Sequence, residues 1–292
     1  MLAKTSRCRV HGPEDSDSAA EWLEKSLPLD ADCYASIRTA AAQMNFSDGK
    51  VPDIRALNQL LKNCPQAIVN ANGDAISFAE QNMDPSAYGY EAQIFSTGTV
   101  PTRPDTIHDL FNALVWVSFP LSKAAINARH IAAREKHSAG KNRGPVQDAL
   151  TLFDESGVIV VSDRADLLEC IERFEWKDLF WRQRERVARH MRFFLFGHGL
   201  MEQMLKPYVG VTGKSLLISV EAAWLETNTD ALLQHIDARS RALIASPACF
   251  VRGRDLLPLP LLGIPGWSSD NERESYYDNV QYFRPGRRTE GD

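Results

Sequence analysis

The stretch from residue 100 to residue 130, VPTRPDTIHDLFNALVWVSFPLSKAAINARH, constrains the fold more than any other part of the chain. Apolar side chains recur in it at helical spacing, which is typical of helices buried in a core. Pro120 cannot lie inside a straight helix without the loss of a backbone hydrogen bond, so we expect two helices or one kinked helix there. Imidazole and amide side chains lie among the apolar residues, and buried polar groups must be paired or line a cavity. The stretch therefore predicts a polar pocket within a helical core.

The bulk composition excludes several classes of protein. The chain has 292 residues, 44% of them hydrophobic and 24% charged, which is ordinary for a globular protein. Its net charge of -5 provides no general attraction to nucleic acid or anionic lipid. The five cysteines are far apart and include no CxxC pair, which argues against a disulfide framework or a structural zinc knuckle. The absence of an apolar leader and of any long apolar run predicts a cytoplasmic protein with no membrane partner.

Local patterns predict a mainly helical chain. Residues 1–18 are polar and predict a flexible arm, followed by a single globular domain over 19–292. Helices are expected at 19–26, 31–45 and 53–64, on both sides of Pro120, over most of 163–206 and at 228–245. A weak hairpin with its turn at 72–74 is expected within 66–82, and a further strand at 88–96.

Two later segments complete the expected fold. Residues 149–162, ALTLFDESGVIVVS, place two β-rich arms around Asp154-Glu155-Ser156-Gly157 and predict an antiparallel hairpin near 150–161. Residues 256–267, LLPLPLLGIPGW, hold three prolines and two glycines and predict an extended strap over the core. The fold class expected is α+β, predominantly helical, with a few antiparallel strands.

Six blocks occur in order along the chain: VPTRPDTIHDLFNALVW, FPLSKAAINARH, DALTLFDESGVIVV, FGHGLMEQMLKPY, LPLLGIPGW and YYDNVQYFRP. Together they resemble a family of bacterial proteins catalogued as domain of unknown function 3025. The resemblance covers roughly residues 20–288. It implies a single bacterial domain, and it supplies no catalytic role or cofactor.

The helices around Pro120 carry the first candidate site. His108 and Asn112 are four residues apart and share one helical face. Lys123, Asn127 and His130 share a face of the second helix. If the chain turns at Pro120, these polar stripes face each other across a cleft, where they could orient a substrate, bind a metal or move protons. In the alternative, His108 belongs to the helix start, where Thr106 and Asp109 fit a capping box, and Asn127 and His130 are partly exposed surface.

The second candidate site is Phe196-Gly197-His198-Gly199, followed by Glu202. His198 and Glu202 are four residues apart, a spacing that lets both contact one metal ion or each other. Two glycines in a helix cost about 1 kcal/mol each relative to alanine, so a ligand or another helix is expected to approach closely there. The alternative is a His–Glu hydrogen bond with glycines that allow tight packing.

Two further groups of charged residues are weaker candidates. Arg143 could hold an anionic group and Asp148 could orient an imidazole, or the two could form a salt bridge. Asp154 and Glu155 suit the turn of the predicted hairpin by their residue types alone. A basic helical face could bind a phosphate-rich partner, although a solvated surface is the simpler interpretation. Its residues are Arg182, Arg184, Arg186, Arg189, His190 and Arg192.

These observations lead to two hypotheses. In the first, the chain is a metal-dependent or histidine-dependent hydrolase-like enzyme with its pocket between helices 106–134 and 190–204. Its ligand is a small molecule or an anionic group, and a divalent metal is the cofactor considered. The tentative metal ligands are His108, His130, His198 and Glu202, and the other catalytic candidates are Asn112, Asn127, Arg143 and Asp148. In the second, it is a non-enzymatic binding protein that uses the basic helix 182–192 or the C-terminal strap, with nucleic acid disfavoured but left open.

Overall fold

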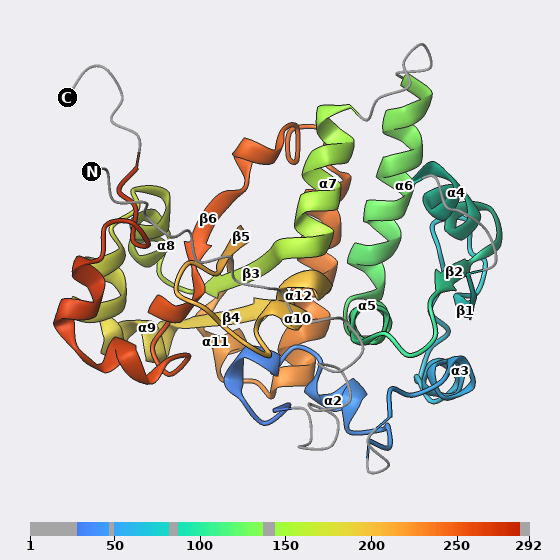
Figure 1. Cartoon of the computed structure of the whole chain (residues 1–292). Coiled ribbons are helices and arrows are strands. Elements are labelled where there is room, and N and C mark those ends of the chain that lie inside the picture. Colours follow the sequence, from blue (N-terminus) through green and yellow to red (C-terminus); the bar gives the residue numbers. More distant parts are fainter. Residues whose placement is uncertain (1–27, 47–49, 82–86, 137–143, 287–292) are drawn as a thin grey trace, which may run out of the picture.

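The computed structural model describes residues 28–46, 50–81, 87–136 and 144–286 (Figure 1), so the predicted arm and the helix expected at 19–26 lie outside the described residues. The α-helices are α2 Arg38–Ala41, α3 Ile54–Lys62, α4 Ala87–Thr97, α5 Ile107–Ser118, α6 Pro120–Lys136, α7 Pro145–Ser156, α8 Ala165–Glu172, α9 Arg184–His190, α10 His198–Gln203, α11 Ala222–Leu225 and α12 Thr229–Ala245. The strands are β1 Ser77–Glu80, β2 Thr99–Thr102, β3 Gly157–Ser162, β4 Met191–Leu195, β5 Thr212–Ser219 and β6 Leu257–Pro260. The helix-rich α+β class is confirmed.

Short helical turns connect these elements. They are the 3-10 helices η1 Asp32–Tyr34, η3 Gly253–Asp255, η4 Leu261–Gly263, η5 Ser269–Glu272 and η6 Glu274–Asp278, and the π-helical turn η2 Asp178–Arg182. The helix expected at 31–45 is thus limited to η1 and α2. The helices expected at 53–64 and 228–245 are confirmed as α3 and α12, and the side chains of Asp53 and Asn228 accept hydrogen bonds at their N-termini.

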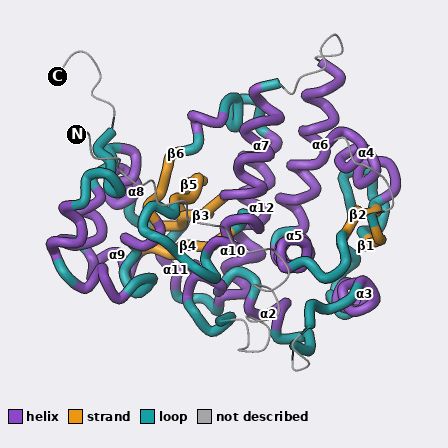
Figure 2. The backbone as a smooth tube through the Cα atoms, in the orientation of Figure 1, coloured by secondary structure: helices purple, strands orange, loops and turns teal. Residues whose placement is uncertain are grey.

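A mixed sheet of strand order β4-β3-β5-β6 lies beside the long helices α7 and α12 (Figure 2). Strand β3 is antiparallel to β4 and parallel to β5, and β6 is antiparallel to β5. Every residue of β3, GVIVVS, is buried, as expected for a central strand that is covered on both faces. The strand β4 lies within 163–206, most of which was predicted to be helical, and that prediction is wrong over residues 191–195.

A second, two-stranded sheet lies on the other side of α6, beside α3 and α4 (Figure 1). The predicted turn at 72–74 is present, with Gly73 at a φ of 89° and an antiparallel bridge between Val69 and Ala75. The predicted hairpin is present but short: Asn70 N–H donates to Asp74 O at 2.9 Å and Ile76 N–H donates to Ile68 O at 2.8 Å, and the strand β1 that follows does not extend this pairing. Instead β1 pairs in parallel with β2, whose residues lie more than twenty positions further along the chain.

The prediction at Pro120 is confirmed, because α5 ends at Ser118 and α6 begins at Pro120. The free N–H groups of Leu121 and Ser122 donate to the carboxylate of Asp237 on α12, both at 2.9 Å. This contact fastens the start of α6 to α12 and sets the angle at which α6 leaves α5.

The hairpin predicted near 150–161 is wrong, because its first arm is the last part of α7. Pro145 begins this helix, where its missing N–H costs nothing, and Ala149, Leu150 and Phe153 are buried on one face at helical spacing. The chain enters β3 directly at Gly157. Asp154 and Glu155 therefore lie in the last turn of a helix and not in a hairpin turn.

The strand predicted at 88–96 is also wrong, because residues Ala87–Thr97 form α4. Ile94 is buried and Tyr90 and Glu91 lie one turn before it, so the three residues share a helical side. Tyr90 and Glu91 are thereby turned towards the cavity described below.

The strap predicted at 256–267 is extended only over residues 257–260, because Leu261–Gly263 form η4, and it is part of the core. Its residues 257–260 form the edge strand β6, where proline is tolerated because one side of the strand needs no hydrogen bond. Leu259, Leu261 and Ile264 are buried. Across the described ranges, no helix combines the length and the apolar character needed to cross a bilayer.

Three phenylalanines hold together the elements that carry the site. The ring of Phe196 lies 4.8 Å from that of Phe153 on α7 and 5.3 Å from that of Phe119 after α5, measured between centroids. Such aromatic contacts add to the stabilisation from buried area. The end of α5, the end of α7 and the turn before α10 therefore meet at one point of the core.

Candidate functional site

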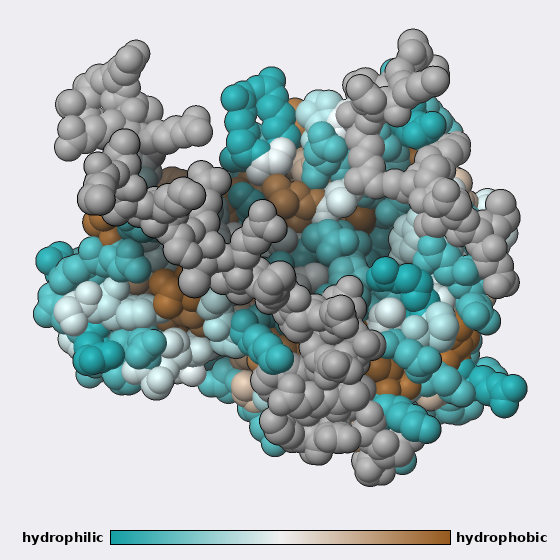
Figure 3. Space-filling view, viewed as in Figure 1, coloured by the Kyte–Doolittle hydropathy of each residue, from teal (hydrophilic) through white to brown (hydrophobic). Residues whose placement is uncertain are grey.

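A cavity of about 290 Å³ opens among α4, α5, α6, α7 and the start of α10. The surface over it, beside the lower half of α7, is hollowed and mostly hydrophilic (Figure 3). The residues that line the cavity are Gln81, Tyr90, Glu91, Pro101, Arg103, His108, Asp109, Asn112, His130, Thr151, Asp154, Glu155 and His198. It thus combines polar residues from both sides of Pro120 with residues from the predicted second site.

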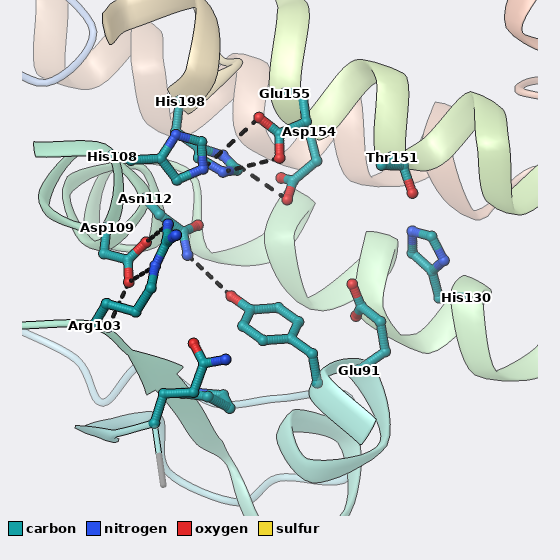
Figure 4. Close-up of a pocket in the computed structure, with 13 residues that line it drawn as sticks. Glu91, Arg103, His108, Asp109, Asn112, His130, Thr151, Asp154, Glu155 and His198 are labelled. Atoms are coloured by element: carbon teal, nitrogen blue, oxygen red, sulfur yellow. Dashed lines mark hydrogen bonds and ion pairs between the residues drawn. The ribbon is translucent and has the colours of Figure 1, made fainter. Parts of the chain in front are cut away.

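Two imidazoles from distant parts of the chain lie against each other in this cavity (Figure 4). The ring centroids of His108 on α5 and His198 on α10 are 4.5 Å apart, with an edge-to-face angle of 73°. His198 is buried, with 5% of its surface exposed, whereas His108 is only partly covered. The sequence-based prediction paired these two histidines, and the structure places them in contact.

Glu155 faces both imidazoles from the end of α7 (Figure 4). Its Oε1 lies 3.5 Å from His198 Nε2, and its Oε2 lies 3.9 Å from His108 Nε2. Burial raises the pKa of the Glu155 carboxyl, but hydrogen bonding and charge from His198, together with His108, outweigh it and hold that pKa below its usual value. Glu155 is therefore an anion at neutral pH.

Glu202 holds His108 from outside the cavity. Its Oε2 lies 3.0 Å from His108 Nδ1, across one turn of α10 from His198. This hydrogen bond is the main cause of the raised pKa of His108. The bond also occupies Nδ1, so Nε2 is the nitrogen that His108 presents to Glu155 and the cavity.

Asp154 is held by a buried lysine. Lys123 on α6, with 4% of its side chain exposed, donates from Nζ to both carboxylate oxygens of Asp154, at 2.6 and 2.8 Å. Burial raises the pKa of Asp154, but the Lys123 ammonium and the His198 ring outweigh it, and the pKa lies below its usual value. Oδ2 of Asp154 is 4.0 Å from His198 Nδ1, a buried atom with no hydrogen-bond partner among the described residues.

Two acidic residues at the carboxyl end of α7 are locally unfavourable, because the helix dipole places partial negative charge there. Lys123 and His198 compensate for this cost through tertiary contacts. Residues that are unfavourable in their local structure but stabilised by tertiary contacts are a common mark of a functional site.

The two glycines before and after His198 allow the close approach of α7. A Cβ on Gly197 would lie 2.4 Å from the backbone nitrogens of Ser156 and Gly157, and a Cβ on Gly199 would lie 2.5 Å from Glu155 Oε2. The tight packing predicted from the sequence is therefore present. At Gly199 the missing side chain leaves room for the carboxylate of Glu155, which faces the imidazoles.

The other predicted site residues lie in different places. Asn112 and His130 line the cavity, but the ring of His130 lies apart from the imidazole pair, near Thr151 (Figure 4). Asn127 is buried beside it and donates to Glu91 Oε2 at 2.6 Å. Asp148 is exposed on α7 and does not line the cavity, and Arg143 lies outside the described residues.

The helix start before His108 differs from the predicted capping box. Thr106 is the N-cap residue, but its side chain makes no capping bond. The carboxylate of Asp109 binds Arg103 instead, through its backbone N–H at 2.5 Å and its guanidinium at 2.8 Å. Asp109 therefore fastens the loop between β2 and α5 at the edge of the cavity.

Several residues of the site were missed as site residues in the sequence. Asp154 and Glu155 were assigned to a turn, and Tyr90 and Glu91 fell in a predicted strand. The helical spacing of Ala149, Leu150 and Phe153, with Pro145 at the start, is the signal that could have placed the two carboxylates on a helix.

The basic face of the alternative hypothesis is largely paired within the protein. Arg182 binds Asp178 at 3.3 Å, Arg184 binds Glu272 at 2.9 Å, and Arg186 binds Asp166 at 2.6 Å. Surface pairs of this kind contribute little stability, but they reduce the charge available to a polyanion.

The donor atoms at the centre of the site suit a metal ion. One ligand atom each from His108, His198 and Glu155 lie within 4.8 Å of one another. A zinc ion with tetrahedral donors at about 2.0–2.1 Å requires donors about 3.3 Å apart, so a small inward movement of these side chains would suffice. The cavity leaves room for a water molecule or a substrate atom on the open side.

Comparison with known proteins identifies the family. Residues 76–287 match the family described as "Protein of unknown function (DUF3025)", and the chain belongs to this family. No curated protein and no solved structure matches the chain. The matched region contains the whole of the cavity lining.

Proposed function

We propose that this member of the DUF3025 family is a hydrolase that binds one divalent metal ion, of the zinc type, through His108, His198 and Glu155. The observation that carries the proposal is the convergence of two imidazoles and one ionised carboxylate, from three helices, on a cavity open to a small molecule. Two histidines and one carboxylate, with a fourth position left open, are a ligand set of catalytic zinc sites.

The surrounding residues support the same interpretation. Glu202 binds His108 Nδ1, which is the arrangement that orients a metal-binding imidazole and makes it a better ligand. Asp154 faces the free Nδ1 of His198 at 4.0 Å, so a small shift of either side chain gives His198 the same kind of support. Lys123 in turn holds Asp154 in place.

A cation at this position would polarise a substrate oxygen and lower the pKa of a bound water towards neutrality. The protein's own part is to keep Glu155 ionised, to turn the two Nε2 atoms inward and to shield one side of the water. The role predicted for His130 and Glu202 changes accordingly: Glu202 becomes the orienting carboxylate, and His130 is assigned to the substrate side of the cavity.

Metal binding gives the direct test. Full-length protein is stripped with a chelator and titrated with zinc against a chromophoric competitor. We expect one zinc ion per chain, and a loss of affinity of roughly 100-fold or more for His198→Ala and Glu155→Gln, because each removes a ligand.

His190→Ala is the matched control, because His190 also pairs with a carboxylate, Asp163 at 3.0 Å, but outside the cavity. It is expected to bind zinc as the unmodified protein does. Equal zinc affinity in His198→Ala and the unmodified protein, or no zinc binding at all, contradicts the proposal. A screen of ester, amide and phosphoester substrates with zinc-loaded protein, with His198→Ala as the blank, then tests for hydrolysis.

A further inference from the structure

A chain of hydrogen bonds runs from Asp154, beside the candidate metal site, to Tyr90 of α4, which also lines the cavity. Lys123 Nζ, which binds Asp154, also donates to Asn112 Oδ1 at 2.9 Å. Asn112 Nδ2 then donates to the hydroxyl oxygen of Tyr90 at 3.0 Å, and the dashed line from Asn112 in Figure 4 marks this bond. Asn112 and Tyr90 both line the cavity.

The direction of every bond in this chain is determined by Lys123. An ammonium group has donors and no acceptor, so the Asn112 atom that meets it must be the carbonyl oxygen. The other end of the Asn112 amide is then a donor, and the Tyr90 oxygen must accept. The hydroxyl proton of Tyr90 is thus left to donate elsewhere, and no acceptor for it occurs among the described residues.

Tyr90 also keeps this proton under ordinary conditions. Burial, with the neighbouring charges of Glu91 and Asp154, raises the pKa of its phenol well above the usual value. A neutral, fixed donor on the wall of a cavity is the kind of group that stabilises a developing oxyanion.

We propose that the Tyr90 hydroxyl donates a hydrogen bond to the carbonyl oxygen of an uncharged ester or amide substrate whose carbonyl carbon is attacked at the His108–His198–Glu155 site. This inference rests on the proposed function, and it makes Tyr90 a catalytic residue. Asn112 and Lys123 act through Tyr90 and are positioning residues.

The charges around the cavity favour an uncharged substrate over a phosphate. Four carboxylates line it, those of Glu91, Asp109, Asp154 and Glu155. Arg103 supplies a permanent positive charge, but the Asp109 carboxylate already binds it at 2.8 Å. Lys123 is likewise bound to Asp154 at 2.6 Å, so neither of these described cations is left to bind a phosphate, whereas an ester or amide needs no such partner.

The proposed hydrolysis needs no reactant other than the substrate and water. A water molecule first loses one proton to solvent. The hydroxide oxygen forms a bond to the carbonyl carbon, and the π electron pair moves to the carbonyl oxygen, which Tyr90 stabilises. The pair then returns, the bond to the leaving oxygen or nitrogen breaks, and the leaving group takes the hydroxide proton. The products are a carboxylate and an alcohol or amine.

Acetohydroxamate is a suitable probe, because it binds zinc and presents a carbonyl oxygen beside it. Its affinity is measured calorimetrically with zinc-loaded unmodified protein, Tyr90→Phe and Tyr208→Phe, the last of which alters an exposed tyrosine outside the cavity. We expect Tyr90→Phe to retain its zinc and to bind the probe about tenfold or more weakly, because one hydrogen bond to a charged ligand is lost.

The outcomes separate this inference from the proposed function. Absence of zinc binding in the unmodified protein overturns both. Normal zinc binding with equal probe affinity in Tyr90→Phe and the unmodified protein overturns the role of Tyr90 alone. Inorganic phosphate is titrated in parallel, and tighter binding of phosphate than of acetohydroxamate overturns the substrate class. Lys123→Arg, which keeps the charge and the donor, is expected to retain more of the probe affinity than Asn112→Leu, which breaks the chain.

Discussion

Gly199→Ala tests the geometry of the candidate site with the smallest possible change. The new Cβ would lie 2.5 Å from Glu155 Oε2, whereas ordinary contacts begin near 3.4 Å, so the carboxylate must move by about 1 Å. His108 Cε1, at 3.6 Å, would be in ordinary contact and need not move. Metal sites tolerate changes in ligand distance of only about 0.2 Å. We therefore expect the zinc affinity to fall by about 10- to 100-fold or more.

The free energy of unfolding should respond differently. The atom met at 2.5 Å is the end of a flexible side chain, and the backbone oxygen of Glu155, at 3.2 Å, needs to give by only a few tenths of an ångström. Alanine is favoured over glycine in helices by about 0.5–1 kcal/mol. We expect the stability of Gly199→Ala to stay within about 1 kcal/mol of the unmodified protein, as measured by urea unfolding of the metal-free form. Gly197→Ala should lose several times more, roughly 2–4 kcal/mol, because its Cβ would meet backbone nitrogens at 2.4 Å.

The assay is a zinc titration of Gly199→Ala beside Gln203→Ala, which changes an exposed residue on the same helix. Gln203→Ala is expected to match the unmodified protein in both zinc affinity and stability. Unchanged zinc affinity in Gly199→Ala would refute the assignment of Glu155 as a ligand. A loss of stability equal to that of Gly197→Ala would refute the view that the large displacement falls on the Glu155 side chain and that its backbone needs only a small adjustment.

Three further predictions follow from contacts in and around the cavity. Lys123→Met leaves the Asp154 carboxylate without its buried partner and should lower the free energy of unfolding by about 3–5 kcal/mol. The double variant Lys123→Met with Asp154→Asn should lose less free energy of unfolding. Equal losses in the single and the double variant would contradict the pairing. The pKa of Asp154 is depressed in the folded protein, so its contribution to stability is present above its unfolded pKa and is lost as the pH falls through its folded pKa. In urea unfolding between about pH 6 and pH 3, the unmodified protein should therefore lose free energy of unfolding more steeply than that double variant. Burial raises the pKa of the Cys33 thiol to about 12, so at pH 8 about one thiol in 10⁴ is ionised. Cys33 should therefore react with a thiol reagent only as fast as the protein unfolds. Rapid labelling of Cys33, located by mass spectrometry, would show that the thiol is accessible and contradict this prediction.

The backbone around Pro120 was predictable because its causes are local. A proline ends or starts a helix through its own ring and its missing N–H, whatever surrounds it. The same holds for the caps at Asp53 and Asn228 and for the absence of an α-helix from the strap at 256–267, which holds three prolines and two glycines. The errors at α4 and α7 have another origin, because short apolar runs fit both a strand and a helix and the surrounding core decides between them.

The site was predictable only in part for the same reason. His108 and His198 stood out in the sequence because imidazoles are rare among apolar residues, and their pairing in one pocket was foreseen. Glu155 did not stand out, because its role depends on the end of α7 meeting the turn at Gly197, a contact between segments about forty residues apart.

The sequence by itself determined that helices predominate, that the chain turns at Pro120 and that polar side chains must be accommodated inside a helical core, because these follow from residue type and spacing. Only the tertiary structure decided which of those side chains meet. Position 155 became a neighbour of two imidazoles, and position 90 the acceptor of a hydrogen bond from Asn112, through the packing of helices that are distant in the chain, and no local pattern records how such helices pack.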